Sequence, residues 1–285
     1  MFFDNFYIPY YIIKAMIDEL QQKLGSLIKA LEVFLVLKDA KPVSRVILTE
    51  DLSDYLCGLG LFVEKADFKI KKLDNGDYSN KGEVVSLDKE GKLVFYIAKN
   101  VKLAKKAKEL EAENDHLNLG LALGYPKCCC DFFENNKKDF AFKNNDFLPA
   151  SLTESKGYIF PFYNNIAARY FDYTLLHHFP CNLNCKASLK LAKKYLDVIG
   201  KEDFKIASLI KENLLHTVIH TSIGTFQLKN SKLKENHIHY DSIRANNVNK
   251  LGEMLNNFKK INVIDKNRIL INNQELNNIN VMLFF

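Results

Sequence analysis

Lys92-Leu93-Val94-Phe95-Tyr96-Ile97-Ala98 is followed almost at once by Val101-Lys102-Leu103-Ala104-Lys105-Lys106-Ala107-Lys108, and the change in residue type between the two runs decides the fold class. The first run is rich in β-branched and aromatic residues, which is typical of a strand. The second is dominated by Ala, Lys and Leu, which favour a helix. The chain therefore passes from strand to helix near residue 100.

On the amino-terminal side of this change, two further β-rich runs precede the strand, at Phe68–Leu73 and Glu83–Leu87. Turn-forming stretches separate the runs at Asp74–Gly82 and Asp88–Gly91, so the three predict an antiparallel meander. Farther out, apolar residues recur at helical spacing over residues 9–38, and Gly25 is the expected break between two helices. Val43–Leu48 is predicted as a strand.

On the carboxyl-terminal side, helical chemistry extends over residues 99–123 and ends at Gly124, a residue common just after a helix. Residues 124–216 predict mostly helix, with Phe147–Gly157 as a loop, and residues 217–285 predict mixed structure. The fold class is therefore α+β. The expected domains are 1–99 (helices plus meander), 100–216 (a helical metal-site domain) and 217–285 (a mixed α/β part).

Composition excludes several classes of protein. The chain has 285 residues, 47% hydrophobic and 26% charged, which is typical of a globular protein rather than a disordered or fibrous one. Its apolar stretches are too short to span a bilayer, and a basic region typical of a signal peptide does not precede the aromatic residues near Met1. We therefore expect a cytoplasmic protein with no membrane partner.

Six cysteines in an apparently cytoplasmic chain favour metal or redox chemistry over structural disulfides. Three are consecutive, Cys128 to Cys130, directly after Gly124 and Pro126. Pro126 suits the first turn of a helix, so the sequence places these thiols at a helix start, where the positive end of the helix dipole favours thiolate ligands.

A second pair, Cys181 and Cys185, stands just before another predicted helix. Thiolates select zinc, copper(I) or iron–sulfur clusters. Adjacent residues on a helix diverge by about 100°, so one of the vicinal cysteines together with Cys181 and Cys185 is the easier ligand set. Three thiolates would leave an open position for a small-molecule or sulfur substrate, and this favours an iron–sulfur centre, [4Fe–4S], with zinc as the alternative.

The same residues carry a family resemblance. Leu123-Gly124-Tyr125-Pro126-x-Cys128-Cys129, Asn164-Asn165-x-x-x-Arg169-Tyr170-Phe171 and His178-Phe179-Pro180-Cys181-x-x-x-Cys185-x-x-Ser188 resemble an uncharacterised, mainly archaeal family that is defined only as a domain of unknown function. The resemblance covers about residues 117–200. It implies that Cys128, Cys129, Cys181 and Cys185 belong together, ranks Cys130 below them, and implies no reaction.

Four other residues complete the candidate site. His178 is a candidate proton donor or fourth ligand, and Arg169 is a candidate for binding an anionic substrate. Tyr125 and Asn164 are candidates for lining or holding a bound group. Each residue also has a simpler interpretation. His178 could be an ordinary histidine at a helix end and Arg169 a packing arginine. Tyr125 could be only a pocket wall, and Asn164 a helix cap.

The net charge is +6, and lysines gather in residues 99–108 and 186–194. A zinc-stabilised RNA-binding module is therefore one alternative function, although such lysines are also typical of solvated helix faces. A dithiol/disulfide redox protein is the other. The sequence contains no phosphate-binding glycine loop and no nucleophile elbow, so nucleotide and serine hydrolysis are not expected.

Overall fold

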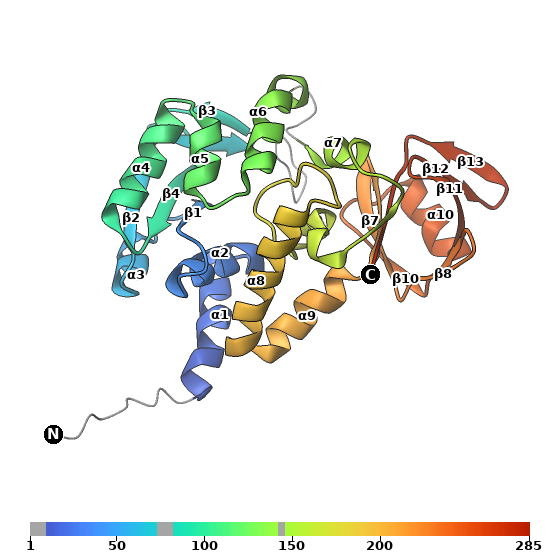
Figure 1. Cartoon of the computed structure of the whole chain (residues 1–285), viewed down its shortest axis with the longest axis horizontal. Coiled ribbons are helices and arrows are strands. Elements are labelled where there is room, and N and C mark those ends of the chain that lie inside the picture. Colours follow the sequence, from blue (N-terminus) through green and yellow to red (C-terminus); the bar gives the residue numbers. More distant parts are fainter. Residues whose placement is uncertain (1–9, 73–81, 142–145) are drawn as a thin grey trace.

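A computed structural model describes residues 10–72, 82–141 and 146–285 of the chain. The architecture is α+β, as predicted, and Figure 1 shows amino-terminal helices, an antiparallel sheet, a helical middle and a strand-rich carboxyl-terminal part. The predicted turn Asp74–Gly82 lies outside the described residues except for Gly82. The domain boundaries near residues 100 and 216 remain predictions.

The first two helices are α1 (Tyr10–Leu24) and α2 (Leu27–Leu37), and they are separated where the sequence predicted. Gly25 has a φ of 69°, a left-handed conformation that glycine adopts at little cost. Ser26 then caps α2, because its hydroxyl accepts a hydrogen bond from Lys29 N. Helix α2 is almost wholly buried.

Sheet A contains β1 (Val43–Leu48), β2 (Phe62–Lys72), β3 (Gly82–Val85) and β4 (Lys92–Ala98) in the order β1-β4-β2-β3. All of its pairings are antiparallel, as expected for this region, and β4 pairs with both β1 and β2. Helix α3 (Ser53–Gly58), between β1 and β2, was not predicted.

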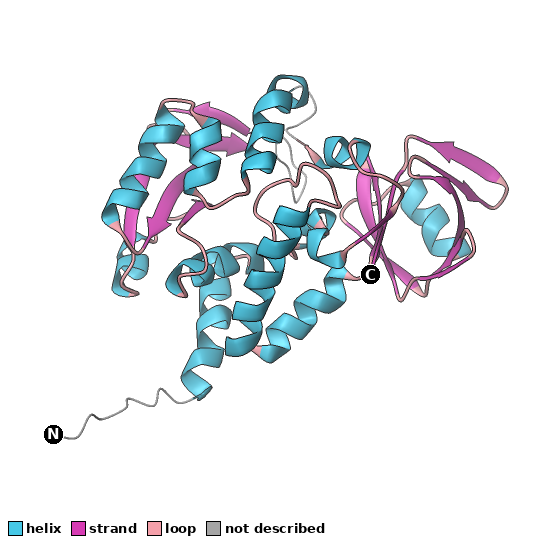
Figure 2. Ribbon diagram, viewed as in Figure 1, coloured by secondary structure: helices cyan, strands magenta, loops and turns pink. Residues whose placement is uncertain are grey.

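Two helices, α4 (Val101–Ala112) and α5 (His116–Ala122), pack against sheet A. The sequence predicted one helix here, but Asn114 has a φ of 57° and breaks it. Gly124, at a φ of 82°, ends α5 as predicted, and α6 (Lys127–Ala141) begins three residues later. After these two breaks, at Asn114 and Gly124, α6 begins near the centre of the molecule (Figure 2).

The segment between α6 and the next long helix is less helical than predicted. The expected loop Phe147–Gly157 was wrong in part, because α7 (Leu148–Thr153) lies inside it with proline in its first turn. Short elements follow: β5 (Ile159–Phe160) and the 3₁₀ helices η1 (Phe162–Asn164) and η2 (Ile166–Phe171). An irregular stretch then leads to α8 (Lys186–Glu202) and α9 (Phe204–Leu214), which bury apolar residues against α2 and α1 in the main core.

The carboxyl-terminal part contains two five-stranded sheets and one helix. The first sheet has the order β10-β7-β6-β14-β5 and the second β13-β12-β11-β9-β8. The bounds are β6 (Thr217–Thr221), β7 (Gly224–Lys229), β8 (Lys232–Lys234), β9 (His237–His239), β10 (Ser242–Ala245), α10 (Lys250–Phe258), β11 (Lys260–Asp265), β12 (Arg268–Ile271), β13 (Gln274–Asn277) and β14 (Asn280–Phe284). The last strand pairs in parallel with β5, which joins this part to the middle of the chain.

Candidate metal centre

The first two cysteines of the site lie in the first turn of α6. Cys129 N and Cys130 N both donate hydrogen bonds to Pro126 O, at 2.9 and 3.1 Å. The bond from Cys129 spans only three residues, so the turn is tighter than a regular α-helical turn. The sulfurs of Cys128 and Cys129 lie 3.8 Å apart as a result, and the divergence expected of adjacent helical residues does not separate them.

The other two cysteines lie in a short loop that ends at the start of α8, where Cys185 is the N-cap residue. Asn164 holds this loop, because its side-chain nitrogen donates to Leu183 O and Cys185 O, both at 3.1 Å. Asn164 is fully buried, and a buried side-chain amide of this kind is costly to leave without hydrogen bonds. The loop is therefore fixed by a side chain that precedes it by about twenty residues.

Two buried serines of the α7 region support the same loop. Ser151 Oγ donates to Pro180 O at 2.6 Å, and Leu183 N donates to Ser155 Oγ at 2.7 Å. The unpredicted helix α7 thus has a clear role, since Ser151 lies in it and Ser155 follows its C-cap, Glu154, so the helix positions one hydroxyl group and the turn after it the other.

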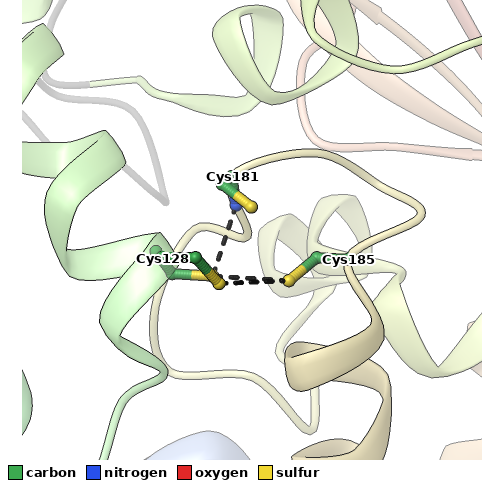
Figure 3. A group of neighbouring side chains, drawn as sticks. Cys128, Cys181 and Cys185 are labelled. Atoms are coloured by element: carbon green, nitrogen blue, oxygen red, sulfur yellow. Dashed lines mark hydrogen bonds between the residues drawn. The ribbon is translucent and has the colours of Figure 1, made fainter.

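Four cysteines lie close together, and Figure 3 labels three of them, Cys128, Cys181 and Cys185. The sulfurs of Cys128, Cys129, Cys181 and Cys185 all lie within 4.8 Å of one another. Cys185 Sγ is 3.7 Å from the sulfurs of both Cys128 and Cys129. Cys129 and Cys185 are buried, Cys181 is partly buried and Cys128 is exposed. The predicted ligand set is thus brought together, and this cluster has the ligand types and spacing to hold a metal ion.

Hydrogen-bond donors surround the most buried sulfur. Ser188 Oγ lies 3.2 Å from Cys129 Sγ, and Cys181 N donates to the same sulfur at 3.4 Å. Ser188 Oγ also lies 2.9 Å from Nε2 of His178. If Ser188 donates to a Cys129 thiolate, His178 must donate from Nε2 to Ser188, which leaves its Nδ1 unprotonated.

The thiols of the centre also affect one another's protonation. A hydrogen bond from the Cys129 thiol lowers the pKa of Cys185 to about 4, and Ser188 adds to this effect. The same hydrogen bond, together with burial, raises the pKa of Cys129. Burial and the neighbouring Cys185 raise the pKa of Cys181 to about 12. When no ion is bound, the cluster therefore favours one thiolate at Cys185, and a metal ion must displace protons from its neighbours.

The other predicted residues lie near the cluster in different ways. The ring of His178 lies 5.0 Å from that of Tyr125, and burial lowers the pKa of His178 to about 3. His178 therefore reaches the cysteines through Ser188. The Arg169 guanidinium lies 4.6 Å from the ring centre of Phe179. Cys130 points away from the cluster, since its thiol donates to Tyr125 O at 3.8 Å.

A buried charged group next to the site was not predicted. Lys41 Nζ lies 3.0 Å from a Glu32 carboxylate oxygen, 3.4 Å from Nδ1 of His177 and 5.2 Å from the ring centre of Tyr125. Burial lowers the pKa of Lys41 and holds that of His177 well below its usual value. Nothing in the sequence around Glu32 or Lys41 distinguishes them from other charged residues of a helix and its end.

Comparison of the chain with protein-family models, with curated proteins and with solved structures finds no match. Among the described residues, every helix is too short or too polar to cross a membrane.

Proposed function

We propose that this protein holds a single tetrahedral metal ion, zinc, through the thiolates of Cys128, Cys129, Cys181 and Cys185. The observation that carries the proposal is the spacing of the four sulfurs, which lie within 4.8 Å of one another, with three pairs at 3.7–3.8 Å. Zinc–sulfur bonds of about 2.3 Å in a tetrahedron separate the sulfurs by about 3.8 Å. The three sulfur–sulfur distances among Cys128, Cys129 and Cys185 agree with this value.

The [4Fe–4S] cluster favoured by the sequence fits this spacing less well. In such a cluster each thiolate binds a different iron, so the four sulfurs surround a group of eight atoms and stand farther apart than around one ion. A single iron ion would fit the same tetrahedron as zinc. An iron–sulfur cluster would require the Cys181–Cys185 loop to move away from α6, against the hydrogen bonds that Asn164 donates to this loop and the one that Leu183 N donates to Ser155.

Four protein ligands favour a structural role for the ion, because catalytic zinc sites usually keep one position for water or substrate. The ligands come from the start of α6 and from the loop and N-cap of α8. An ion bound there would join α6, which follows the helices that pack on sheet A, to α8, which packs on α2. The proposed role of the centre is to fix this junction.

One observation favours a polyanion as the partner of such a zinc-stabilised protein. Four exposed lysines lie on one side of α8, two of them adjacent in the sequence, and the last of the four donates to Ala40 O at 2.7 Å. None forms an ion pair with a carboxylate of the described residues. They are Lys186, Lys190, Lys193 and Lys194. Binding of single-stranded RNA that weakens steeply with salt would support this second proposal, and salt-independent or absent binding would contradict it.

The deciding experiment is purification without oxygen, followed by measurement of zinc, iron and acid-labile sulfide. We expect one zinc per chain and no sulfide, and a cobalt-substituted protein with the intense absorption of tetrahedral cobalt thiolate. The Cys181→Ser variant should lose most of the metal, whereas Cys57→Ser, at an exposed cysteine outside the cluster, should retain it. About four iron and four sulfide per chain would instead support the cluster, and a chain without metal would contradict both.

A further inference from the structure

We propose that Cys128 is the reactive thiolate of the centre, the one sulfur that attacks a soft carbon electrophile while the other three remain ligands. This inference rests on the proposed metal centre. It assigns different roles to four residues that are chemically identical in the sequence.

The four sulfurs differ first in their hydrogen bonds. Cys129 Sγ has two donors, Ser188 Oγ and Cys181 N. Cys185 receives hydrogen bonds from Ser188, and Asn182 Nδ2 donates to Cys181 Sγ at 3.5 Å. Within the described part of the chain, Cys128 Sγ has only other sulfurs within hydrogen-bonding distance. Donors withdraw electron density from a metal-bound thiolate, so Cys128 keeps the most.

The cysteine with the fewest hydrogen-bond donors is also the most exposed to solvent. Cys129 is 2% exposed and Cys185 is 6% exposed, whereas Cys128 belongs to the exposed class. Of the four cysteines, Cys128 is therefore the one most open to a reagent in solution. The ammonium group of the neighbouring residue Lys127 is paired with Asp131 at 2.8 Å. Accessibility and electron density thus select the same residue.

The chemical step is a simple displacement. The lone pair of the Cys128 thiolate forms a sulfur–carbon bond, the bond from that carbon to its leaving group breaks, and the leaving group departs with the electron pair. No proton moves, because the metal-bound sulfur is already deprotonated. The product is a thioether at Cys128, with three thiolates still available to the ion. The substrate class is an alkyl group on a good leaving group.

The test treats the zinc-loaded full-length protein with iodoacetamide and follows the label on each cysteine by peptide mass spectrometry. Exposed Cys57 reports that the probe is active, and buried Cys130 reports unfolding. We expect Cys128 to be labelled about tenfold or more faster than Cys129, Cys181 and Cys185. Equal labelling of all four, or faster labelling of another ligand, would overturn the assignment.

A pair of variants tests the contribution of hydrogen bonding. Ser188→Ala removes a hydroxyl donor to both Cys129 and Cys185, so the label on these two cysteines should rise several-fold relative to Cys128. Ser44→Ala removes an equally buried hydroxyl that donates to Glu32 O, away from the cysteines, and it should leave the ratio unchanged. An unchanged ratio in Ser188→Ala would contradict the hydrogen-bond argument. Zinc content, measured before the probe is added, tests the proposed centre separately.

Discussion

Ser26 and Asp172 are 146 residues apart in the chain, yet the Ser26 hydroxyl donates a hydrogen bond of 2.5 Å to the Asp172 carboxylate. The other carboxylate oxygen accepts from Leu27 N at 2.6 Å. Asp172 therefore caps α2 from outside the helix, and its negative charge lies at the positive end of the helix dipole. Because Asp172 directly follows η2, the cap attaches the irregular middle segment to the amino-terminal core.

This relationship predicts the effect of changing Asp172. Replacement by alanine should lower the free energy of unfolding by about 1–2 kcal/mol, as for the loss of an N-cap. Asp172 has a φ of 65°, a conformation that asparagine also tolerates. Asp172→Asn should therefore cost less, because it keeps one acceptor and the backbone geometry. Urea unfolding of the three proteins measures the difference, and equal stability of the alanine variant and the wild type would contradict the capping role.

The sequence predicts those parts of the fold that local chemistry determines. Gly25 and Gly124 end helices because their left-handed backbone conformations are easy only for glycine, and Val43–Leu48 is a strand with the predicted bounds. The segment 172–185 has no such local signal. Its path depends on side-chain contacts with residues that are distant in the sequence. Ser155 and Asn164 form hydrogen bonds to the backbone of this segment, and Asp172, at its start, binds Ser26. Periodicity contains no information about such contacts.

The candidate site was predictable to a similar extent. Thiol chemistry and the two helix starts predicted a site between the Cys128–Cys130 run and the Cys181/Cys185 pair, with one vicinal cysteine as ligand, whereas both Cys128 and Cys129 lie in the cluster. The set of four and the lower rank of Cys130 came from the family resemblance, and Cys130 does point away from the cluster. The hydroxyl of Ser188 between Cys129 and His178 was not predicted, because a serine inside a helix has no distinctive pattern. The Lys41–Glu32 pair was also missed, since burial of a charged residue depends on the tertiary fold.

Cys130 has a packing role that a double-mutant cycle can measure. A Cβ added at Gly120 would lie 2.7 Å from Cys130 Sγ, which is closer than real Cβ contacts. Gly120→Ala should therefore destabilise the protein by about 1–3 kcal/mol, although alanine is the better helix former. In a Cys130→Ala background the sulfur is absent, and Gly120→Ala should then be neutral or stabilising by up to about 1 kcal/mol.

Denaturant unfolding of the four proteins gives the coupling energy between the two positions. Additive effects would show that Cys130 does not restrict α5, and would contradict the contact. Metal content provides a second measurement: Cys130→Ala should retain the ion, because this thiol points to Tyr125 O and away from the cluster. Loss of the ion in Cys130→Ala would assign Cys130 a ligand role.

Asn164 and Asn165 are adjacent and buried but hold different segments. Asn164 binds Leu183 O and Cys185 O beside the cysteines, whereas Asn165 donates to Leu214 O and accepts from Ala168 N. Asn164→Ala should weaken metal affinity by about 10–100-fold, the usual effect of removing a group that orients a ligand. Asn165→Ala should destabilise the fold without this loss. Chelator competition on both variants makes the comparison, and equal affinities would contradict the positioning role of Asn164.

His177 predicts a pH dependence of stability. Burial, with Lys41 and Arg169 nearby, holds its pKa well below the usual 6.5, while Glu32 lies 3.8 Å from Nδ1 without reversing the shift. The unfolded chain therefore binds a proton near pH 6.5 that the folded chain does not bind. Stability from this group is fully present above that pH and is lost as the pH falls, by at most about 1.4 kcal/mol per pH unit. In His177→Gln the free energy of unfolding should fall less steeply between pH 6.5 and 5. Unfolding curves across this range, with metal content measured at each pH, test the prediction, and parallel curves for variant and wild type would show that His177 is protonated equally in both states.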